Sequence, residues 1–492
     1  NAVDFGDILL HSYFILTNNK DIQETHSNFI QHILIDEFQD TNLLQYDLIK
    51  LLLNNNQNLF CVGDDDQSIY AWRGAKIENI INFPNEFNCE VVRLTKNYRS
   101  NNAILEAASS VISNNKNRLG KNLESYNNEI PEQKINLKSF YSQEEESLWV
   151  ADNISRKYND QETFGILVRL TAQMRSIEDK LIKYALPYEI IGGPRFFERK
   201  EIKDVLSYLK LANSHSDDLS FERIINLPRR GIGEQSIKII IDHSRSNNLS
   251  FFESLKDLAQ SNKLSPSLLS KTQPFIDLIN KISDLINKTS LEDLGIFVIE
   301  ESGYLKMLEN EKNKLKQIEN ESRIDNLKEL VNALSEFENL DEFLEHVGLV
   351  NENQKKTHQN SIKLMTLHAA KGLEFDHVYL PGWEEGIFPS SRALEQNSTK
   401  SLEEERRLAY VGITRAKYDL NLSYASSRYT YGINNYSLPS RFLSEIKSIN
   451  LEETNYIDNQ SDTDKPKLLS SDNIALSPGK KRMMEFLNKH KK

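Results

Sequence analysis

The sequence predicts an α/β fold built on parallel sheets, with a mostly helical domain inserted into it. Short apolar strands alternate with helical patterns before about residue 190 and return after about residue 360, a pattern typical of parallel sheets with crossover helices. Between about residues 195 and 355, apolar residues recur at helical spacing, as in Ile202, Val205 and Leu209, and strand signals nearly vanish. With 492 residues, the chain is long enough for several domains.

The expected elements follow in chain order. The first strands are expected at Ile33–Ile35, Leu59–Val62 and Val91–Leu94. Further strands are expected at Phe164–Val168, Tyr188–Ile191, Ser361–Thr366, His377–Leu380 and Leu420–Tyr424. Taken with the family resemblance described below, which implies two lobes with the first of them incomplete, this pattern gives the first lobe as 1–92, the two parts of the second lobe as 93–190 and 358–448, the helical insertion as 191–357, and a flexible basic tail as 449–492.

Composition limits the classes of function. The formal net charge of −12 argues against a uniformly basic nucleic-acid coat, but a local basic groove remains compatible with it because nucleic acid responds to the local field. The only two cysteines, Cys61 and Cys89, lie in apolar strand-like runs, so we expect buried free thiols. The sequence has no Cys/His cluster with metal-ligand spacing and no apolar run of membrane-spanning length. We therefore expect a soluble intracellular protein.

Two strand ends carry acidic residues. The apolar run Ile33–Ile35 stops at Asp36 and Glu37, and Gln39 follows. One carboxylate at such a strand end can hold Mg²⁺ beside phosphates, while the next orients or deprotonates the attacking water. About thirty residues later, a second strand ends before Asp-Asp-Asp-Gln (64–67). The first segment alone could be a simple acidic strand-to-helix turn; the two segments in this order argue against that interpretation.

Five segments resemble one family of motor enzymes. They are Ile-Asp-Glu-Phe-Gln-Asp-Thr-Asn (35–42), Val-Gly-Asp-Asp-Asp-Gln-Ser-Ile-Tyr-Ala-Trp-Arg-Gly-Ala (62–75), Leu-Thr-Lys-Asn-Tyr-Arg-Ser (94–100), Thr-Leu-His-Ala-Ala-Lys-Gly-Leu-Glu-Phe (366–375) and Tyr-Val-Gly-Ile-Thr-Arg-Ala-Lys (410–417). In this order, and over nearly the whole chain, they resemble superfamily 1 DNA helicases of the UvrD/Rep/PcrA type. The resemblance implies two RecA-like lobes, and segments 192–204 and 226–233 place the helical insertion where that family has its 2B domain.

The resemblance implies an ATP site with Mg²⁺. Asp36 resembles the carboxylate on the Mg²⁺ side and Glu37 the base that activates water. Gln67 resembles the amide that contacts both the γ-phosphate and the water. Arg99 and Arg415 resemble two arginine fingers, whose rigid guanidinium groups match the charge that spreads over phosphoryl oxygens in the transition state.

Two further residues would contact the nucleoside. Tyr98 resembles an aromatic residue that stacks on adenine, with a core tyrosine as the alternative. Glu374 resembles the carboxylate that accepts a hydrogen bond from the ribose, with a helix-capping glutamate as the alternative.

The resemblance also implies single-stranded DNA binding, which combines base stacking with electrostatic attraction. Trp72 resembles the base-stacking tryptophan, with Tyr70, Arg73 and His368 nearby in role. A core position is the alternative for the three rings. Arg169 is a weaker candidate for a phosphate contact.

A second nucleic-acid contact is expected in the helical insertion. Gly231 and Gly233 follow two arginines and suggest a loop whose backbone N–H groups meet duplex phosphates. A plain turn between helices is the alternative.

One family motif is missing from the printed sequence. The phosphate-binding loop, Gly-x-x-x-x-Gly-Lys-[Ser/Thr], occurs nowhere, and the family places it upstream of Val3. We therefore expect an N-terminally truncated helicase. This chain alone should bind ATP poorly, and its hydrolysis activity is doubtful.

The resemblance implies an ATP-dependent helicase that moves 3′ to 5′ on single-stranded DNA in the bacterial cytoplasm, in repair, replication or recombination. Expected partners are single strands and single-strand/double-strand junctions. The tail is a candidate contact for repair proteins or RNA polymerase, with a solvated disordered tail as the alternative, and the protein is expected to be a monomer or weak dimer. Two other interpretations stay open: a non-catalytic DNA-binding or partner-binding chain that has lost the motor, and the helicase part of a nuclease–helicase subunit.

Overall fold

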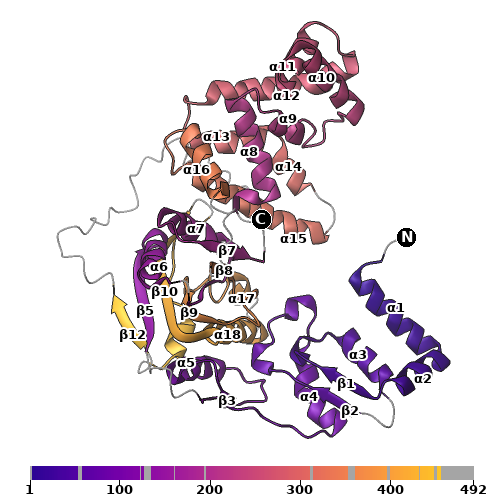
Figure 1. Ribbon diagram of the computed structural model, residues 1–492, viewed down its shortest axis with the longest axis vertical. Coiled ribbons are helices and arrows are strands. Elements are labelled where there is room, and N and C mark those ends of the chain that lie inside the picture. The colour runs from indigo at the N-terminus through magenta and orange to yellow at the C-terminus, as the bar shows by residue number, and fades with distance from the viewer. Residues whose placement is uncertain are drawn as a thin grey trace. The chain divides into compact units, whose positions relative to one another are not determined.

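The structure, a computed structural model, describes residues 3–53, 58–121, 123–126, 134–159, 161–192, 196–310, 314–352, 361–395, 399–430, 433–447 and 451–455. The chain divides into two compact units (Figure 1). The first comprises Asn1–Gly192, Gln359–Ser426 and Ser437–Ser461, and the second comprises Gly193–His358, Ser427–Tyr436 and Asp462–Lys492. The predicted α/β class is confirmed, because parallel sheets with helices make up the first unit.

The N-terminal part of the first unit contains a small parallel sheet. Strands β1 (His32–Ile35) and β2 (Asn58–Cys61) pair along their whole length, and Ile35 lies opposite Cys61. The helices and 3₁₀ turns of this part are α1 (Phe5–Asn18), α2 (Lys20–Phe29), η1 (Phe38–Asp40), α3 (Leu43–Leu52), η2 (Asp65–Gln67), η3 (Ala71–Arg73) and α4 (Ile77–Phe87). The acidic segments that follow β1 and β2 therefore start at the carboxyl ends of two neighbouring parallel strands, where α/β proteins place their ligand sites.

A larger sheet forms the rest of the first unit. Its strand order is β12–β5–β10–β9–β6–β8–β7. The strands are β5 (Ile135–Ser142), β6 (Phe164–Val168), β7 (Tyr188–Ile191), β8 (Ile362–Thr366), β9 (Phe375–Leu380), β10 (Ala416–Thr430) and β12 (Leu451–Asn455). Every residue of β6 is buried, as expected for a parallel strand covered on both faces. Gly165 in this strand lets the Phe375 ring approach, since a Cβ there would lie 2.6 Å from a ring carbon.

Helices around this sheet begin at recognisable caps. The Ser142 side chain caps α6 (Gln143–Lys157), whose first turn is acidic and whose last turn carries Arg156 and Lys157. This distribution of charge complements the helix dipole. The remaining elements of this part are β3 (Lys96–Asn97), α5 (Asn102–Ile112), β4 (Glu124–Ser125), η4 (Thr171–Gln173), α7 (Met174–Lys183), α17 (Ser391–Glu395), α18 (Thr399–Ile413) and α19 (Arg441–Glu445).

The second unit is mostly helical. Its elements are η5 (Phe196–Glu198), α8 (Lys200–Asn213), α9 (Asp218–Ile224), α10 (Glu234–Asn247), α11 (Phe251–Gln260), α12 (Pro266–Leu285), α13 (Leu291–Glu301), α14 (Tyr304–Glu309), α15 (Lys314–Leu334), α16 (Leu340–Glu352) and the short strand β11 (Ile433–Tyr436). Helix α8 is central, and its Tyr208 is fully buried. The Tyr208 hydroxyl donates to Leu227 O at 2.6 Å and accepts from Arg230 at 2.7 Å.

The structure differs from the sequence-based expectations at several places. The predicted strand Val91–Leu94 is wrong: these residues are exposed and have no regular structure, because apolar β-formers need a neighbouring strand and the described residues supply none here. Strands β5 and β12 were not predicted. Strand β12 lies within the segment assigned to the tail and pairs with β5, and residues 456–492 of that tail lie outside the described residues.

The cysteine prediction is confirmed in part. Both Cys61 and Cys89 are free, but both are only partly buried. They lie at the margin of the small core around Phe38 and Phe83 rather than inside it. None of the helices in the described part of the chain has the length and apolar character that crossing a bilayer requires.

Candidate functional site

The turn after β1 holds its acidic pair in an unusual backbone conformation. Glu37 has a φ of 50° and a ψ of 41°, which is the left-handed region that non-glycine residues rarely occupy and that is over-represented at functional sites. Two hydrogen bonds hold this turn: Asp36 Oδ1 accepts from Glu37 N at 2.9 Å, and Phe38 N donates to Val62 O at 3.0 Å. The Glu37 side chain remains 54% exposed, so its carboxylate is available to a ligand.

Gln39 lies directly behind this pair and is 0% exposed. Its Nε2 donates to Glu37 Oε2 at 2.5 Å, and its Oε1 accepts from Asp64 N at 2.9 Å. No role for Gln39 follows from the sequence, because nothing local shows that its side chain joins the two strand ends.

Lys371 reaches the same carboxylates from the loop before β9. Its Nζ lies 2.5 Å from Asp40 Oδ2 and 3.3 Å from Glu37 Oε2, and it donates to Gln67 O at 2.9 Å. The Lys371 side chain is only 7% exposed. Burial raises the pKa of Asp40, and the ion pair with Lys371 opposes this shift. The sequence analysis missed Lys371, although it lies inside one of the quoted segments.

The oxygen atoms around this turn fit a hard divalent cation. Asp36 is exposed, and Asp40 Oδ1 is buried without a hydrogen-bond partner among the described residues. Carboxylate oxygens of this kind are the ligands that Mg²⁺ prefers. The Mg²⁺ role of Asp36 stays a prediction, and Asp40 is a neighbouring carboxylate that the sequence alone did not single out.

Gln67 and Arg415 meet although they are far apart in sequence. Gln67 Nε2 donates to Asp64 Oδ2 at 2.7 Å, and Arg415 donates to Gln67 Oε1 at 3.4 Å. Arg415 is 2% exposed, and backbone oxygens orient it, with Val411 O at 2.9 Å and Leu373 O at 3.1 Å. Burial, with Arg99 nearby, lowers the pKa of Arg415 to about 10. This value still leaves the guanidinium charged at neutral pH.

Arg99 and Glu374 form a second pair beside Arg415. Arg99 Nε donates to Glu374 Oε2 at 2.8 Å, and Arg99 also donates to Thr414 O at 3.3 Å. Lys417, which the sequence analysis did not assign, lies 3.0 Å from Glu374 Oε1. Hydrogen bonding to Lys417 lowers the pKa of Glu374. Glu374 precedes β9 and caps no helix, so the capping alternative is wrong.

Tyr98 is a surface residue rather than a core tyrosine. The residue is 65% exposed, and its ring packs against that of Tyr126 in a tilted arrangement with centroids 4.8 Å apart. The ring is therefore held by a neighbour in an exposed setting, which suits stacking on a base.

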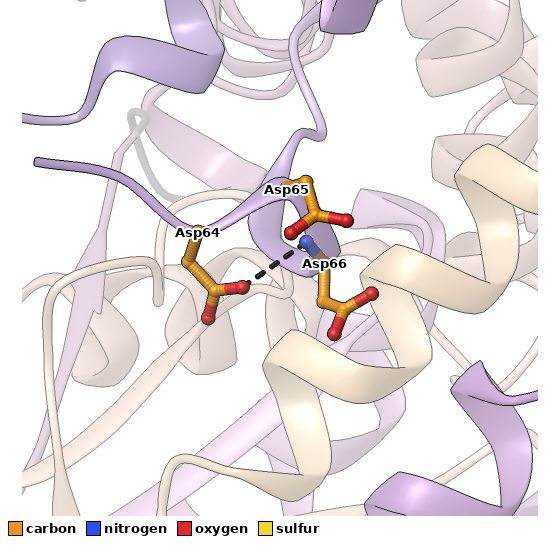
Figure 2. Close-up of side chains that lie close together, drawn as sticks. All are labelled: Asp64, Asp65 and Asp66. Atoms are coloured by element: carbon orange, nitrogen blue, oxygen red, sulfur yellow. Dashed lines mark hydrogen bonds between the residues drawn. The ribbon is translucent and has the colours of Figure 1, made fainter. Parts of the chain in front are cut away.

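Three adjacent aspartates, Asp64–Asp66, begin the loop after β2 (Figure 2). Their carboxylate oxygens lie within 4.8 Å of one another, and Asp66 N donates to Asp64 Oδ1 at 3.1 Å. Each carboxylate has a partner: Lys121 for Asp64, the backbone N–H of Leu119 for Asp65 and Arg118 for Asp66. The chain's own cations and amide therefore satisfy this cluster, and we assign no metal ion to it.

The aromatic residues of the next turn form a separate group. Trp72 is 64% exposed, so the core alternative for it is wrong. Its ring lies 6.3 Å from that of Tyr70 and 6.5 Å from that of His368, and the Arg73 guanidinium lies 4.6 Å from its centroid. Tyr70 and His368 are partly buried, and Tyr70 Oη donates to His368 O at 3.2 Å. A cavity of about 470 Å³ adjoins Trp72 and His368.

Arg169 also borders this cavity, but its side chain is engaged. Its guanidinium donates to both oxygens of Glu405, at 3.1 and 2.6 Å. A bidentate pair of this kind holds the arginine in place. The pair with Glu405 uses Nε and one terminal nitrogen of the guanidinium, and the role of Arg169 as a phosphate contact stays a prediction.

The glycine loop of the second unit is a turn with a constrained backbone. Gly231 has a φ of +74°, and Gly233 precedes the first residue of α10. The Asn226 side chain accepts from the backbone N–H groups of Arg230 and Ile232, at 2.8 and 3.3 Å. Two of the loop's N–H groups are thus used internally, and the role of Gly231 and Gly233 in duplex binding stays a prediction.

Comparison with known proteins identifies the family. The model for the UvrD/REP helicase N-terminal domain matches residues 1–88, and the model for the UvrD-like helicase C-terminal domain matches residues 92–427. The chain belongs to the UvrD-like helicase family. This confirms the resemblance drawn from the five segments.

Individual relatives are similar over most of the chain. A probable DNA helicase II homolog of Rickettsia conorii is 43% identical over 457 residues, which is 91% of this chain and 68% of that protein. DNA helicase II of Escherichia coli is 41% identical over 92% of this chain and 64% of that protein. ATP-dependent DNA helicase PcrA of Bacillus subtilis is 39% identical, over 92% of this chain and 63% of that protein.

Proposed function

We propose that this UvrD-like chain couples ATP hydrolysis to movement along single-stranded DNA and to separation of DNA strands. The observation that carries the proposal is the contact of Arg415 with Gln67. It brings a buried, charged guanidinium from the end of α18 to an amide that follows β2. An arginine and a polar amide around a transferring phosphoryl group, with a carboxylate nearby for water, are the parts that phosphoryl-transfer sites share.

Each residue has a distinct task in this proposal. Glu37 accepts a proton from the attacking water, and Gln67 orients that water. Arg99 and Arg415 stabilise the charge on the phosphoryl oxygens. Bound at Asp36, Mg²⁺ would neutralise charge on the phosphates.

The nucleoside would lie near the Arg99–Glu374 pair. Tyr98 precedes Arg99 in the chain, and its exposed ring offers the base a stacking face. Glu374 accepts from the ribose hydroxyl once Arg99 turns toward phosphate. Lys417 stays on the carboxylate and keeps it ionised.

Single-stranded DNA would stack on Trp72, with Tyr70, Arg73 and His368 beside it. Burial, with Arg169 nearby, lowers the pKa of His368 to about 4. The imidazole is therefore neutral at pH 7, and it contributes a flat ring rather than a charge. Trp72 follows Gln67 by only five residues, so a shift in the nucleotide site can move the base platform. The names of the relatives, DNA helicase II and PcrA, support a DNA substrate.

The further details of the proposal come from the family resemblance. The protein would move 3′ to 5′ and would act at single-strand/double-strand junctions in repair, replication or recombination. It would be located in the cytoplasm, as a monomer or weak dimer.

The test is strand separation by the protein expressed from its complete gene. A partial duplex with a 3′ single-stranded tail should be unwound when ATP and Mg²⁺ are present, and the same duplex with a 5′ tail should not. Binding of single strands without hydrolysis or unwinding would instead favour a chain that binds DNA without a motor. Preferential unwinding of the duplex with a 5′ tail would support an ATP-driven motor that moves in the direction opposite to the proposed one.

A further inference from the structure

Gln39 connects the two strand ends that carry the proposed chemistry. It is 0% exposed, and both ends of its carboxamide are used: Nε2 donates to Glu37 Oε2, and Oε1 accepts from Asp64 N. We propose that Gln39 is a positioning residue that fixes the Glu37 carboxylate relative to the loop carrying Gln67. This inference rests on the proposed function, since it concerns the water that Glu37 and Gln67 would share.

Only a side chain with a donor and an acceptor at this length can make both contacts. Glutamate would keep the acceptor for Asp64 N but would place a second carboxylate against Glu37. Leucine would leave the Asp64 N–H without this acceptor and Glu37 without this donor. Asparagine is one methylene shorter and cannot reach both groups from the same backbone position.

The surrounding backbone is shaped around the Gln39 carboxamide. A Cβ on Gly63 would lie 2.6 Å from Gln39 Oε1, a separation that would force the carboxamide away. Gly63, the second residue after β2, and Asp64 thus create the space and the donor that Gln39 uses. On the other side of Gln39, the backbone of Glu37 is strained. Side-chain contacts fix the position of the Glu37 carboxylate.

The connection extends from Glu37 to the arginine. Glu37 accepts from Gln39, Gln39 accepts from Asp64 N, Asp64 accepts from Gln67, and Gln67 accepts from Arg415. A series of hydrogen bonds of this kind transmits a displacement of Arg415 to the carboxylate that faces the water. Loss of the Gln39 link should therefore reduce turnover, while nucleotide and DNA affinity change little.

The experiment compares Gln39→Glu and Gln39→Leu with the unmodified protein, each expressed from the complete gene. The matched control is Gln31→Glu, which adds the same charge in the same part of the chain. Gln31 is exposed and directly precedes β1, at the end of the strand opposite the turn that carries Glu37. The measurements are kcat and KM for ATP with saturating single-stranded DNA, the affinity for single strands, and the melting temperature.

We expect kcat to fall about 10- to 100-fold in both Gln39 variants, the size of effect that misplacing a reacting group by about 1 Å produces. KM, DNA affinity and the kcat of Gln31→Glu should stay within about twofold of the unmodified protein. Should Gln39→Leu fail to fold, Gln39→Glu, which keeps the acceptor for Asp64 N, still tests the inference, and the same selective loss of kcat is expected.

Two results would overturn the inference alone. One is a folded Gln39 variant with normal kcat, and the other is a Gln31→Glu variant that loses as much turnover as Gln39→Glu. Absence of DNA-stimulated hydrolysis in the unmodified protein would be a different result, because it would reject the proposed function and the inference together.

Discussion

Replacing His368 by asparagine should make the first unit less sensitive to acid. Burial is the main cause that lowers the pKa of His368 from 6.5 to about 4. Because the folded value lies below the unfolded one, protons bind the unfolded chain preferentially. The free energy of unfolding is unaffected by this histidine above pH 6.5. It decreases as the pH falls toward 4, because protons then stabilise the unfolded chain. At pH 5 the difference amounts to about 2 kcal/mol, from about 1.4 kcal/mol for each pH unit below the unfolded pKa.

The assay is urea unfolding of the unmodified protein and of His368→Asn at pH 7 and pH 5. The unmodified protein should lose about 2 kcal/mol more than the variant between these two conditions. The exposed His11 offers a matched control, since His11→Asn makes the same replacement on α1 outside the core. Equal pH dependence in His368→Asn and the unmodified protein would show that His368 is not held neutral by burial, and the reasoning would fail.

Three further substitutions separate stability, turnover and DNA binding. Arg415→Lys should lower DNA-stimulated kcat about 1,000-fold, because a lysine cannot reproduce the planar contacts of an arginine finger; steady-state hydrolysis checks this, and a loss below tenfold would argue against the role. Trp72→Ala should weaken single-strand binding by about 1–3 kcal/mol and reduce the stimulation of ATPase by DNA; unchanged fluorescence-anisotropy titrations and hydrolysis would contradict both the stacking and the coupling. Lys371→Met should cost about 3 kcal/mol of stability, since it leaves the Asp40 carboxylate partly buried without its cation; an unchanged urea midpoint would show that solvent replaces the ion pair.

The sequence was sufficient to predict where two strands end and where the candidate catalytic residues follow them. The runs before Asp36 and Asp64 are short, apolar and followed by polar residues, and this local pattern does not depend on distant contacts. The α/β class and the family followed from the same segments. The family resemblance implied a base-stacking role for Trp72, and its exposed position agrees with that expectation.

Contacts between distant segments could not be predicted in this way. Lys371 reaches Asp40 across more than three hundred residues, and nothing local to either residue marks the pair. Arg169 resembled a phosphate contact, but Glu405 holds it with two hydrogen bonds. The run Val91–Leu94 has the composition of a strand and lacks a partner strand among the described residues. In each case tertiary packing, rather than local propensity, decided the outcome.

The most direct test of the central claim is ATP hydrolysis by the protein expressed from its complete gene, measured with and without single-stranded DNA, beside Glu37→Gln. The account expects DNA to stimulate hydrolysis in the unmodified protein. Glu37→Gln should lose that hydrolysis by about 100-fold or more, since a general base contributes about 10²–10⁴-fold, while it still binds single strands. Hydrolysis that persists in Glu37→Gln, or that DNA leaves unchanged in the unmodified protein, would contradict the assignment of this site.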